Sequence, residues 1–140
     1  MQRFDTRYWR NWRNHYTPEQ FILLLKGTIA DMGTDAENIV AADTIFDHWD
    51  ASDPKDLSIM KAFVLANQLT INLTQKPDLP NPSEGSLFYA CMLTFNGERG
   101  NLGETLAIAL EIINDPCSYS DAYILDIKDI LDAFANHRTY

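Results

Sequence analysis

Residues 17–37 read TPEQFILLLKGTIADMGTDAE, and this stretch decides the fold class. The TPEQ at 17–20 places a threonine N-cap before a proline at the first helical position, with a glutamine three residues after the cap. The TDAE at 34–37 repeats this capping box with a glutamate. These signals predict two consecutive helices. We expect the first to run to about Met32 and to end at Gly33 in the left-handed conformation.

Helix signals also govern the rest of the chain. Asp53, before a proline, has the chemistry of an N-cap, and Ser118 or Ser120 is placed to cap the last helix. The segment LFYACMLTF at 87–95 is apolar on all sides and fits either a buried helix or a buried strand. We expect a helix there, because we identify no partner strand with matching turn chemistry after Asn96-Gly97. The expected helices span residues 18–32, 35–50, 54–74, 87–95, 104–114 and 121–136.

Residues 75–86 read QKPDLPNPSEGS and form the longest expected connection. Three prolines and a glycine exclude a helix or a central strand there. We interpret this Pro-rich segment as an internal loop, since neither half of the 140-residue chain is large enough to fold comfortably alone. Short turns between the other elements favour antiparallel neighbours. The sequence therefore predicts a single compact all-α domain over residues 1–140, with about six helices in antiparallel pairs.

The chain has a formal net charge of −9 and a pI near 4.5. A negative charge of this size repels nucleic acid and anionic membrane, and it attracts basic proteins over a Debye length of about 8 Å. The start of the chain is Arg-rich without an apolar export signal, and no apolar run approaches the roughly 18 residues of a membrane span. We therefore expect a cytoplasmic protein with reduced thiols at Cys91 and Cys117, which binds neither membrane nor nucleic acid directly.

The N-terminal segment, residues 1–16, differs from the rest of the chain in charge. It carries a net charge of +3, whereas residues 17–140 carry −12. If the segment is helical, its aromatic residues form one stripe, at Phe4, Tyr8, Trp12 and Tyr16. Its remaining residues include candidates for a secondary interface, which are Arg3, Arg7, Trp9, Arg10 and Arg13. We prefer packing of the stripe on the core, with the arginines paired to aspartates of the same chain. The alternative is a free recognition arm.

A series of aspartates is the main candidate for partner binding: Asp43, Asp47, Asp50, Asp53 and Asp56. The first three share one face of the second expected helix. Such a face can imitate a phosphate backbone or dock on a basic active site, and the alternative is a solvated helix face with capping acids. A calcium loop requires acids at alternate positions and a central glycine, which the series lacks. We adopt partner binding as the functional hypothesis and expect no metal.

No residue pattern predicts catalysis. His15, His48 and His137 lack ligand spacing to one another or to a cysteine, and nothing near Cys117 in sequence would activate it as a nucleophile. The glycine-bearing stretch at 96–103 lacks the Gly-Lys-Ser/Thr ending of a phosphate loop, so we expect an inter-helix turn. We therefore expect no enzyme activity, no cofactor and no metal site.

These features together predict a small acidic inhibitor that binds another protein. An immunity protein that neutralises a toxin, or a phage-type inhibitor of a nucleic-acid-handling enzyme, needs fast association with a basic partner, and charge complementarity supplies it. The alternative is a helical adaptor or oligomeric scaffold domain that uses the aromatic N-terminus as an interface anchor. The sequence is compatible with a monomer or a homodimer.

Overall fold

The computed structural model describes residues 6–47, 57–76, 78–79, 93–95, 98–100 and 102–135. Helices dominate these residues, and the all-α fold class is confirmed. The α-helices are α1 (Thr6–Arg10), α2 (Pro18–Leu25), α3 (Asp35–Asp47), α4 (Leu57–Thr74), α5 (Leu102–Asn114) and α6 (Asp121–Ala135). Shorter elements are the 3-10 helices η1 (Trp12–Asn14) and η3 (Pro116–Ser118), and the strands β1 (Leu93–Phe95) and β2 (Glu98–Gly100).

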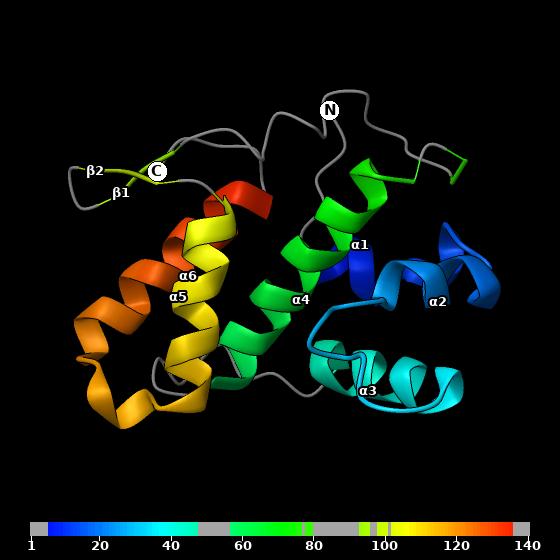
Figure 1. The fold of residues 1–140 in the computed structure, drawn as a ribbon, viewed down its shortest axis with the longest axis horizontal. Coiled ribbons are helices and arrows are strands. Elements are labelled where there is room, and N and C mark those ends of the chain that lie inside the picture. The colour runs from blue at the N-terminus through cyan, green and yellow to red at the C-terminus, as the bar shows by residue number, and fades with distance from the viewer. Residues whose placement is uncertain are drawn as a thin grey trace.

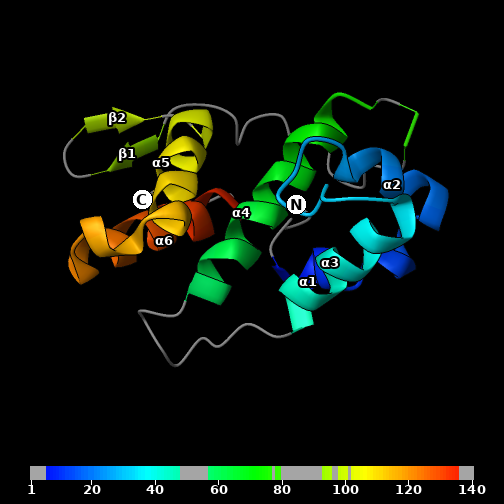
Figure 2. The same ribbon diagram turned by 60° about the horizontal axis from the view of Figure 1, so that its bottom comes forward.

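Helix α4 runs through the centre of the molecule. Figure 1 shows α1, α2 and α3 on one side of it and α5 and α6 on the other, and Figure 2 shows the same division. The sequence of α4 explains this position, because its apolar residues cover two faces of the helix. One face packs with α1–α3 and includes Ala62, Leu65, Ala66, Leu69 and Leu73. The other packs with α5 and α6 and includes Leu57, Met60, Phe63, Val64 and Ile71.

The two halves of the core differ in composition. The half formed by α1–α3 and α4 is aromatic, with buried Tyr8, Trp9, Trp12, Tyr16, Phe21 and Phe46. The half formed by α4–α6 is mainly aliphatic, with buried Leu106, Ala109, Ile112, Ile124, Ile127, Ile130 and Leu131. The apolar residues of α6 recur at helical spacing in the sequence, and they form one face toward the core.

The capping signals produce the helix starts that the sequence predicts. The Thr17 amide donates to Gln20 Oε1 at 2.9 Å, and the Gln20 amide donates to Thr17 Oγ1 at 3.2 Å. Thr34 and Glu37 form the same reciprocal pair at 3.0 and 3.2 Å. Ser120, one of the two serines considered, accepts from the amide of Tyr123 and caps α6. These bonds satisfy amides that a helix start leaves without intrahelical partners.

The first helix of the capping-box pair is shorter than expected. α2 ends at Leu25 rather than near Met32, and the positive φ belongs to Gly27 (76°) rather than to Gly33. A tertiary contact supports this early end, because Asn72 Nδ2 on α4 donates to the carbonyl oxygens of Leu24 and Lys26 at 2.8 and 3.0 Å. These carbonyls lie in the last turn of α2 and at its C-cap, where carbonyl oxygens have no intrahelical hydrogen-bond donor.

The expected helix over residues 87–95 is wrong for residues 93–95. β1 pairs antiparallel with β2, with Leu93 opposite Gly100 and Phe95 opposite Glu98. The expectation of an inter-helix turn over 96–103 is likewise wrong for residues 98–100, which form β2. Asn-Gly is the dipeptide that two-residue hairpins favour, so Asn96-Gly97 is the signal in the sequence that indicates these two strands.

Several expectations fall on residues outside the described part of the chain. These are the end of the second expected helix at 48–50, the N-cap at Asp53, the loop residues 80–86 and the ambiguous residues 87–92. The described residues 75, 76, 78 and 79 are not helical, as the Pro-rich segment predicts.

Candidate functional site

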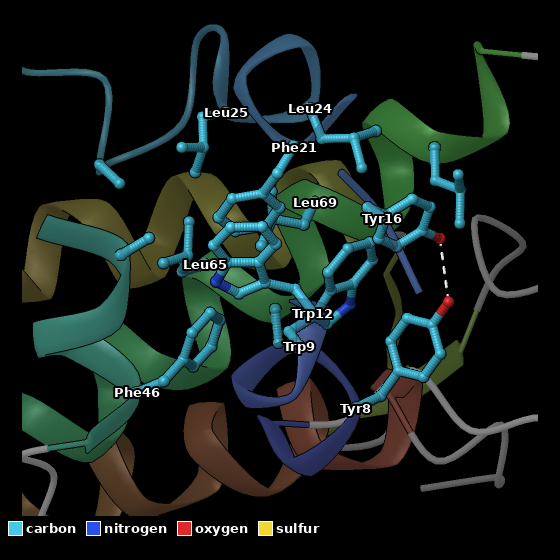
Figure 3. Packing of buried hydrophobic residues seen from close by; sticks show 14 of the residues in the cluster. Tyr8, Trp9, Trp12, Tyr16, Phe21, Leu24, Leu25, Phe46, Leu65 and Leu69 are labelled. Carbon is cyan, nitrogen blue, oxygen red and sulfur yellow. Dashed lines mark hydrogen bonds between the residues drawn. The ribbon is translucent and has the colours of Figure 1, made fainter. Parts of the chain in front are cut away.

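The N-terminal segment is packed into the aromatic half of the core. The side chains of Trp9 and Trp12 are 0% and 1% exposed, and Tyr8 and Tyr16 are also buried. Figure 3 shows these rings gathered with Phe21 and Phe46 against Leu65 and Leu69 of α4. The aromatic residues of the segment that the structure describes are therefore packed on the core. The continuous helical stripe is wrong, because the chain leaves the α-helix after Arg10 and turns through η1.

Specific contacts fix these aromatic side chains. Trp9 Nε1 donates to Thr70 Oγ1 on α4 at 2.9 Å, and the hydroxyls of Tyr8 and Tyr16 share a hydrogen bond of 2.9 Å. The ring of Trp12 stacks on Phe21 of α2, with centroids 4.0 Å apart and an interplanar angle of 4°. Polar tips of buried aromatic residues need partners of this kind.

Asp43, the first residue of the aspartate series, is bound to the N-terminal segment. Its carboxylate accepts from Arg13 Nη1 and Nη2 at 3.1 and 2.8 Å, and from Trp12 Nε1 at 3.0 Å. The hydrogen bond with Asp43 raises the pKa of the Arg13 guanidinium, and the charges of Asp43 and Asp47 add to this effect. One arginine therefore pairs with an aspartate of the same chain, and this side of α3 is partly neutralised from within.

The structure brings only some of the sequence-predicted residues together. Asp47 is exposed at the end of α3, whereas Asp50, Asp53 and Asp56 lie outside the described residues. In the secondary set, Arg7 and Arg10 are exposed, and Arg3 lies outside the described residues together with the stripe residue Phe4. Trp9 belongs to the core in this structure rather than to an exposed interface, because its side chain is fully buried.

A groove lies beside α3, on the side away from the buried residues Ala42 and Phe46. It has a volume of about 880 Å³ and runs between α3, the start of α4 and the end of α5. Most of the side chains that line it are apolar. The lining residues are Ile29, Met32, Ala36, Glu37, Val40, Ala41, Thr44, Ile45, Lys61, Leu110, Ile113 and Asn114.

Helix α3 is apolar toward both the core and this groove. Asn38, Ala42 and Phe46 are its buried residues, at four-residue spacing on one face. Ala36, Val40 and Thr44 repeat the same spacing on the groove side. Val40 is 64% exposed and Met32, in the connection before α3, is 72% exposed. Large apolar side chains that share an exposed groove are typical of a surface that binds another molecule.

The connection between α2 and α3 contributes Ile29 and Met32 to the groove lining. Asn38 Oδ1 accepts from the amides of Met32 and Gly33 at 2.8 Å each, and its Nδ2 donates to Asp31 at 3.0 Å. The amide of Ile29 donates to Gln68 Oε1 on α4 at 2.9 Å, and the Ile29 side chain packs against both halves of the core. The groove therefore lies at the junction of the two halves on a connection with defined hydrogen bonds.

One of the described acidic residues lines the groove, and other exposed acids are sequence neighbours of lining residues. Glu37 lines it, and the hydrogen bonds from Thr34 lower the pKa of the Glu37 carboxyl. Five other lining residues have an acidic neighbour in the chain, which are Asp31, Asp35, Asp43, Glu111 and Asp115, and Asp43 is bound by Arg13. Lys61 also lines the groove, and Lys26 lies 3.7 Å from the Asp35 carboxylate. We call Glu37, Asp31, Asp35, Glu111 and Asp115 the acidic rim, because all five are exposed and either line the groove or adjoin a lining residue in the chain.

The remaining titratable candidates do not converge on this groove. The ring of His15 stacks on Tyr8 with centroids 4.2 Å apart, and burial lowers the His15 pKa. Cys117 is a free, exposed thiol in η3. His48, His137 and Cys91 lie outside the described residues. Among the residues that the structure does describe, no group of three His, Cys, Asp or Glu side chains could hold a metal ion.

Comparisons with known proteins give no relative for this chain. It matches no protein-family model, and neither the curated proteins nor the solved structures include a significant match. None of the described helices combines the length and apolar composition that a membrane crossing requires.

A signal for the groove was present in the sequence. Residues 39–42 read IVAA, and four consecutive apolar residues on a helix of 3.6 residues per turn cannot all face one core. The run therefore indicates a second apolar face on α3. Which face meets the core, and whether the other is covered, depends on the position of α4 and α5.

Proposed function

We propose that this protein is a small acidic inhibitor without catalytic activity, which acts in the cytoplasm by binding a basic protein. A toxin or a nucleic-acid-handling enzyme is a partner of the right charge. The observation that carries the proposal is the exposed apolar groove beside α3, with its acidic rim. Apolar side chains at the centre of an interface supply most of the binding free energy, while charges around them raise the association rate.

We propose that the partner contacts the groove rather than Asp43, the first residue of the aspartate series. Asp43 is held by Arg13 and Trp12, so a partner would have to compete with contacts inside the chain. Asp47 remains exposed and adds negative charge at the end of α3. We therefore assign the aspartates a role in attraction at a distance and the groove the role of contact.

The alternative function is a helical adaptor or scaffold. Trp9 and Trp12 are buried and therefore cannot anchor an interface with another protein. An adaptor could instead bind its partner through the apolar residues of the groove. The two functions differ in what the bound protein does afterwards. An inhibitor abolishes the activity of its partner at a stoichiometric ratio, whereas an adaptor leaves that activity intact.

Affinity capture from the source cell, followed by an activity assay of the captured protein, tests this function. We expect the wild-type protein to retain a basic protein at low salt, to release it at about 1 M salt, where the Debye length is about 3 Å, and to inhibit it. The variant Val40→Asp should lose capture. Leu23→Asp is the matched control, because Leu23 is another exposed apolar residue, on α2 and outside the groove lining. Equal capture by both variants, or capture of a protein whose activity is unchanged, would contradict the inhibitor proposal.

A further inference from the structure

We infer that the groove beside α3 binds an amphipathic helix of the partner, with apolar residues on one face and lysine or arginine beside them. This inference rests on the proposed function and specifies the part of the partner that makes contact. It follows from three properties of the groove: its dimensions, the chemistry of its walls and the charge of its rim.

The dimensions of the groove suit one helix. α3 has 13 residues and is therefore about 20 Å long, at 1.5 Å per residue. The groove side of α3 presents Ala36, Val40 and Thr44 one helical turn apart, opposite Leu110 and Ile113 of α5. Apolar anchors at i, i+3 or i+4, and i+7 of a bound helix would follow the same spacing.

The described walls of the groove favour a helix over an added strand. The described lining residues belong to α3, α4 and α5 and to the connection before α3. A strand that binds by sheet addition needs a free backbone edge, and helices offer none along their sides. An occupant of this apolar groove must therefore satisfy its own backbone hydrogen bonds, as a helix does.

The charge of the rim selects a basic helix. Glu37 and the neighbouring Asp31, Asp35, Glu111 and Asp115 would face the flanks of the bound helix. A second copy of this chain is a poor occupant, because each copy carries a net charge of −9 and the acidic rims would oppose each other. Lysine or arginine on the flanks of a partner helix would instead lie opposite carboxylates.

Three synthetic peptides of about 18 residues test the inference. The first has leucine at i, i+3, i+4 and i+7 with lysine and arginine on the flanks, and the second replaces the bases with glutamate. The third has the composition of the first in an order without a continuous apolar face. Fluorescence anisotropy against the full-length protein should show binding of the first peptide alone, and circular dichroism should show that it gains helix on binding.

Groove variants show where the first peptide binds. Val40→Asp and Met32→Asp should each weaken binding at least about tenfold, and both positions are exposed enough to keep the fold intact, which thermal denaturation checks. Leu23→Asp, outside the groove, should leave binding unchanged. Equal weakening by Leu23→Asp would overturn the inference, because binding would then not depend on the groove. Equal binding of the scrambled peptide would also overturn it, because charge alone would then be enough for binding.

Two variants test whether the charge of the rim affects peptide binding, and each replaces a charged groove-lining residue with glutamine. Glu37→Gln removes one negative charge and keeps a side chain that can complete the capping box, as Gln20 does in α2. Lys61→Gln removes the positive charge of a groove-lining residue. The first change should weaken binding of the basic peptide and the second should strengthen it, each by about two- to fivefold at low salt. Changes in the same direction would contradict the role of the rim.

The outcomes separate this inference from the proposed function. If no peptide binds but capture of a cellular protein still depends on Val40, the groove takes an occupant of another shape, so the function stands and the helix inference is wrong. If sedimentation shows a dimer that Val40→Asp dissociates, the occupant is a second copy, and the inference is again wrong.

Discussion

Trp9 Nε1 on α1 donates a hydrogen bond of 2.9 Å to Thr70 Oγ1 on α4, across 61 positions of sequence. The same hydroxyl donates to the carbonyl oxygen of Ala66 at 2.8 Å. Both side chains are buried, so this contact fixes the N-terminal segment to the central helix at a point without competing solvent. Arg13, in η1 directly after this segment, binds Asp43 of α3, whereas Val40 of the same helix lines the groove.

Replacement of Thr70 measures this contact. Thr70→Val keeps the shape of the side chain but removes the acceptor for Trp9 Nε1, so we expect a loss of about 1–3 kcal/mol in the free energy of unfolding. Thr70→Ser keeps the hydroxyl and loses one methyl group, at a cost of about 1 kcal/mol. Urea denaturation at constant pH compares the two variants. A valine variant no less stable than the serine variant would show that the hydrogen bond adds nothing.

Loss of the N-terminal aromatic contacts should destabilise the whole protein. Trp12→Ala removes the stack on Phe21 and should cost about 3–5 kcal/mol. Deletion of residues 1–16 removes both this stack and the contacts of Trp9. It should lower the melting temperature at least as much as Trp12→Ala does. Arg10→Ala, at an exposed position of the same segment, is the control and should change stability by no more than about 0.5 kcal/mol. An unchanged melting temperature after the deletion is incompatible with a packed segment.

Asp43 should respond differently to two substitutions. Asp43→Asn removes the ion pair with Arg13, whose side chain is 59% exposed, and keeps an acceptor for Trp12 Nε1, so the cost should be at most about 1 kcal/mol. Asp43→Ala also removes that acceptor from a buried indole and should cost about 1–3 kcal/mol. Thermal denaturation in low and high salt separates the two contributions, because only the ion pair is screened. Equal losses for both variants would assign the whole effect to charge.

The stability of the protein should become pH-sensitive in the variant Asn38→Asp, at the connection between α2 and α3. This change places a second carboxylate against Asp31, where Asn38 Nδ2 donates at 3.0 Å. Two carboxylates at this distance repel, so the pair takes up a proton at a higher pH than an ordinary aspartate. A pKa raised in the folded state means that the stability deficit relative to wild type is largest at pH 7 and shrinks toward about pH 4. Urea denaturation at both pH values checks this, and a deficit independent of pH would contradict it.

The tyrosine pair Tyr8 and Tyr16 should limit stability at high pH. Burial raises the pKa of both phenols, and their mutual hydrogen bond raises that of Tyr16 further. Groups with a raised folded pKa contribute stability below the ordinary phenol pKa of about 10, and this contribution is lost as pH rises further. Absorbance titration should show ordinary ionisation of exposed tyrosines before these two ionise with unfolding. Tyr16→Phe should weaken the fall in melting temperature above pH 10, and an unchanged fall would exclude the pair as its cause.

Local patterns in the sequence determined where helices begin. The bonds of Thr17 with Gln20 and of Thr34 with Glu37 join residues three positions apart, so their partners are visible in the sequence itself. The same holds for the apolar side of α6, whose spacing follows from helix geometry. The acidic character of the chain is likewise fixed by composition alone.

Only the tertiary structure decided where α2 ends, what Asp43 contacts and which side of α3 stays open. Asn72 ends α2 from 48 positions away, and Arg13 reaches Asp43 from 30 positions away. Val40 and Phe46 are both apolar residues of one helix, yet one lines the groove and the other is buried, because α4 packs against only one face of α3. Hydrogen bonds within one helical turn are encoded by neighbours in sequence, whereas burial depends on which distant elements arrive at each face.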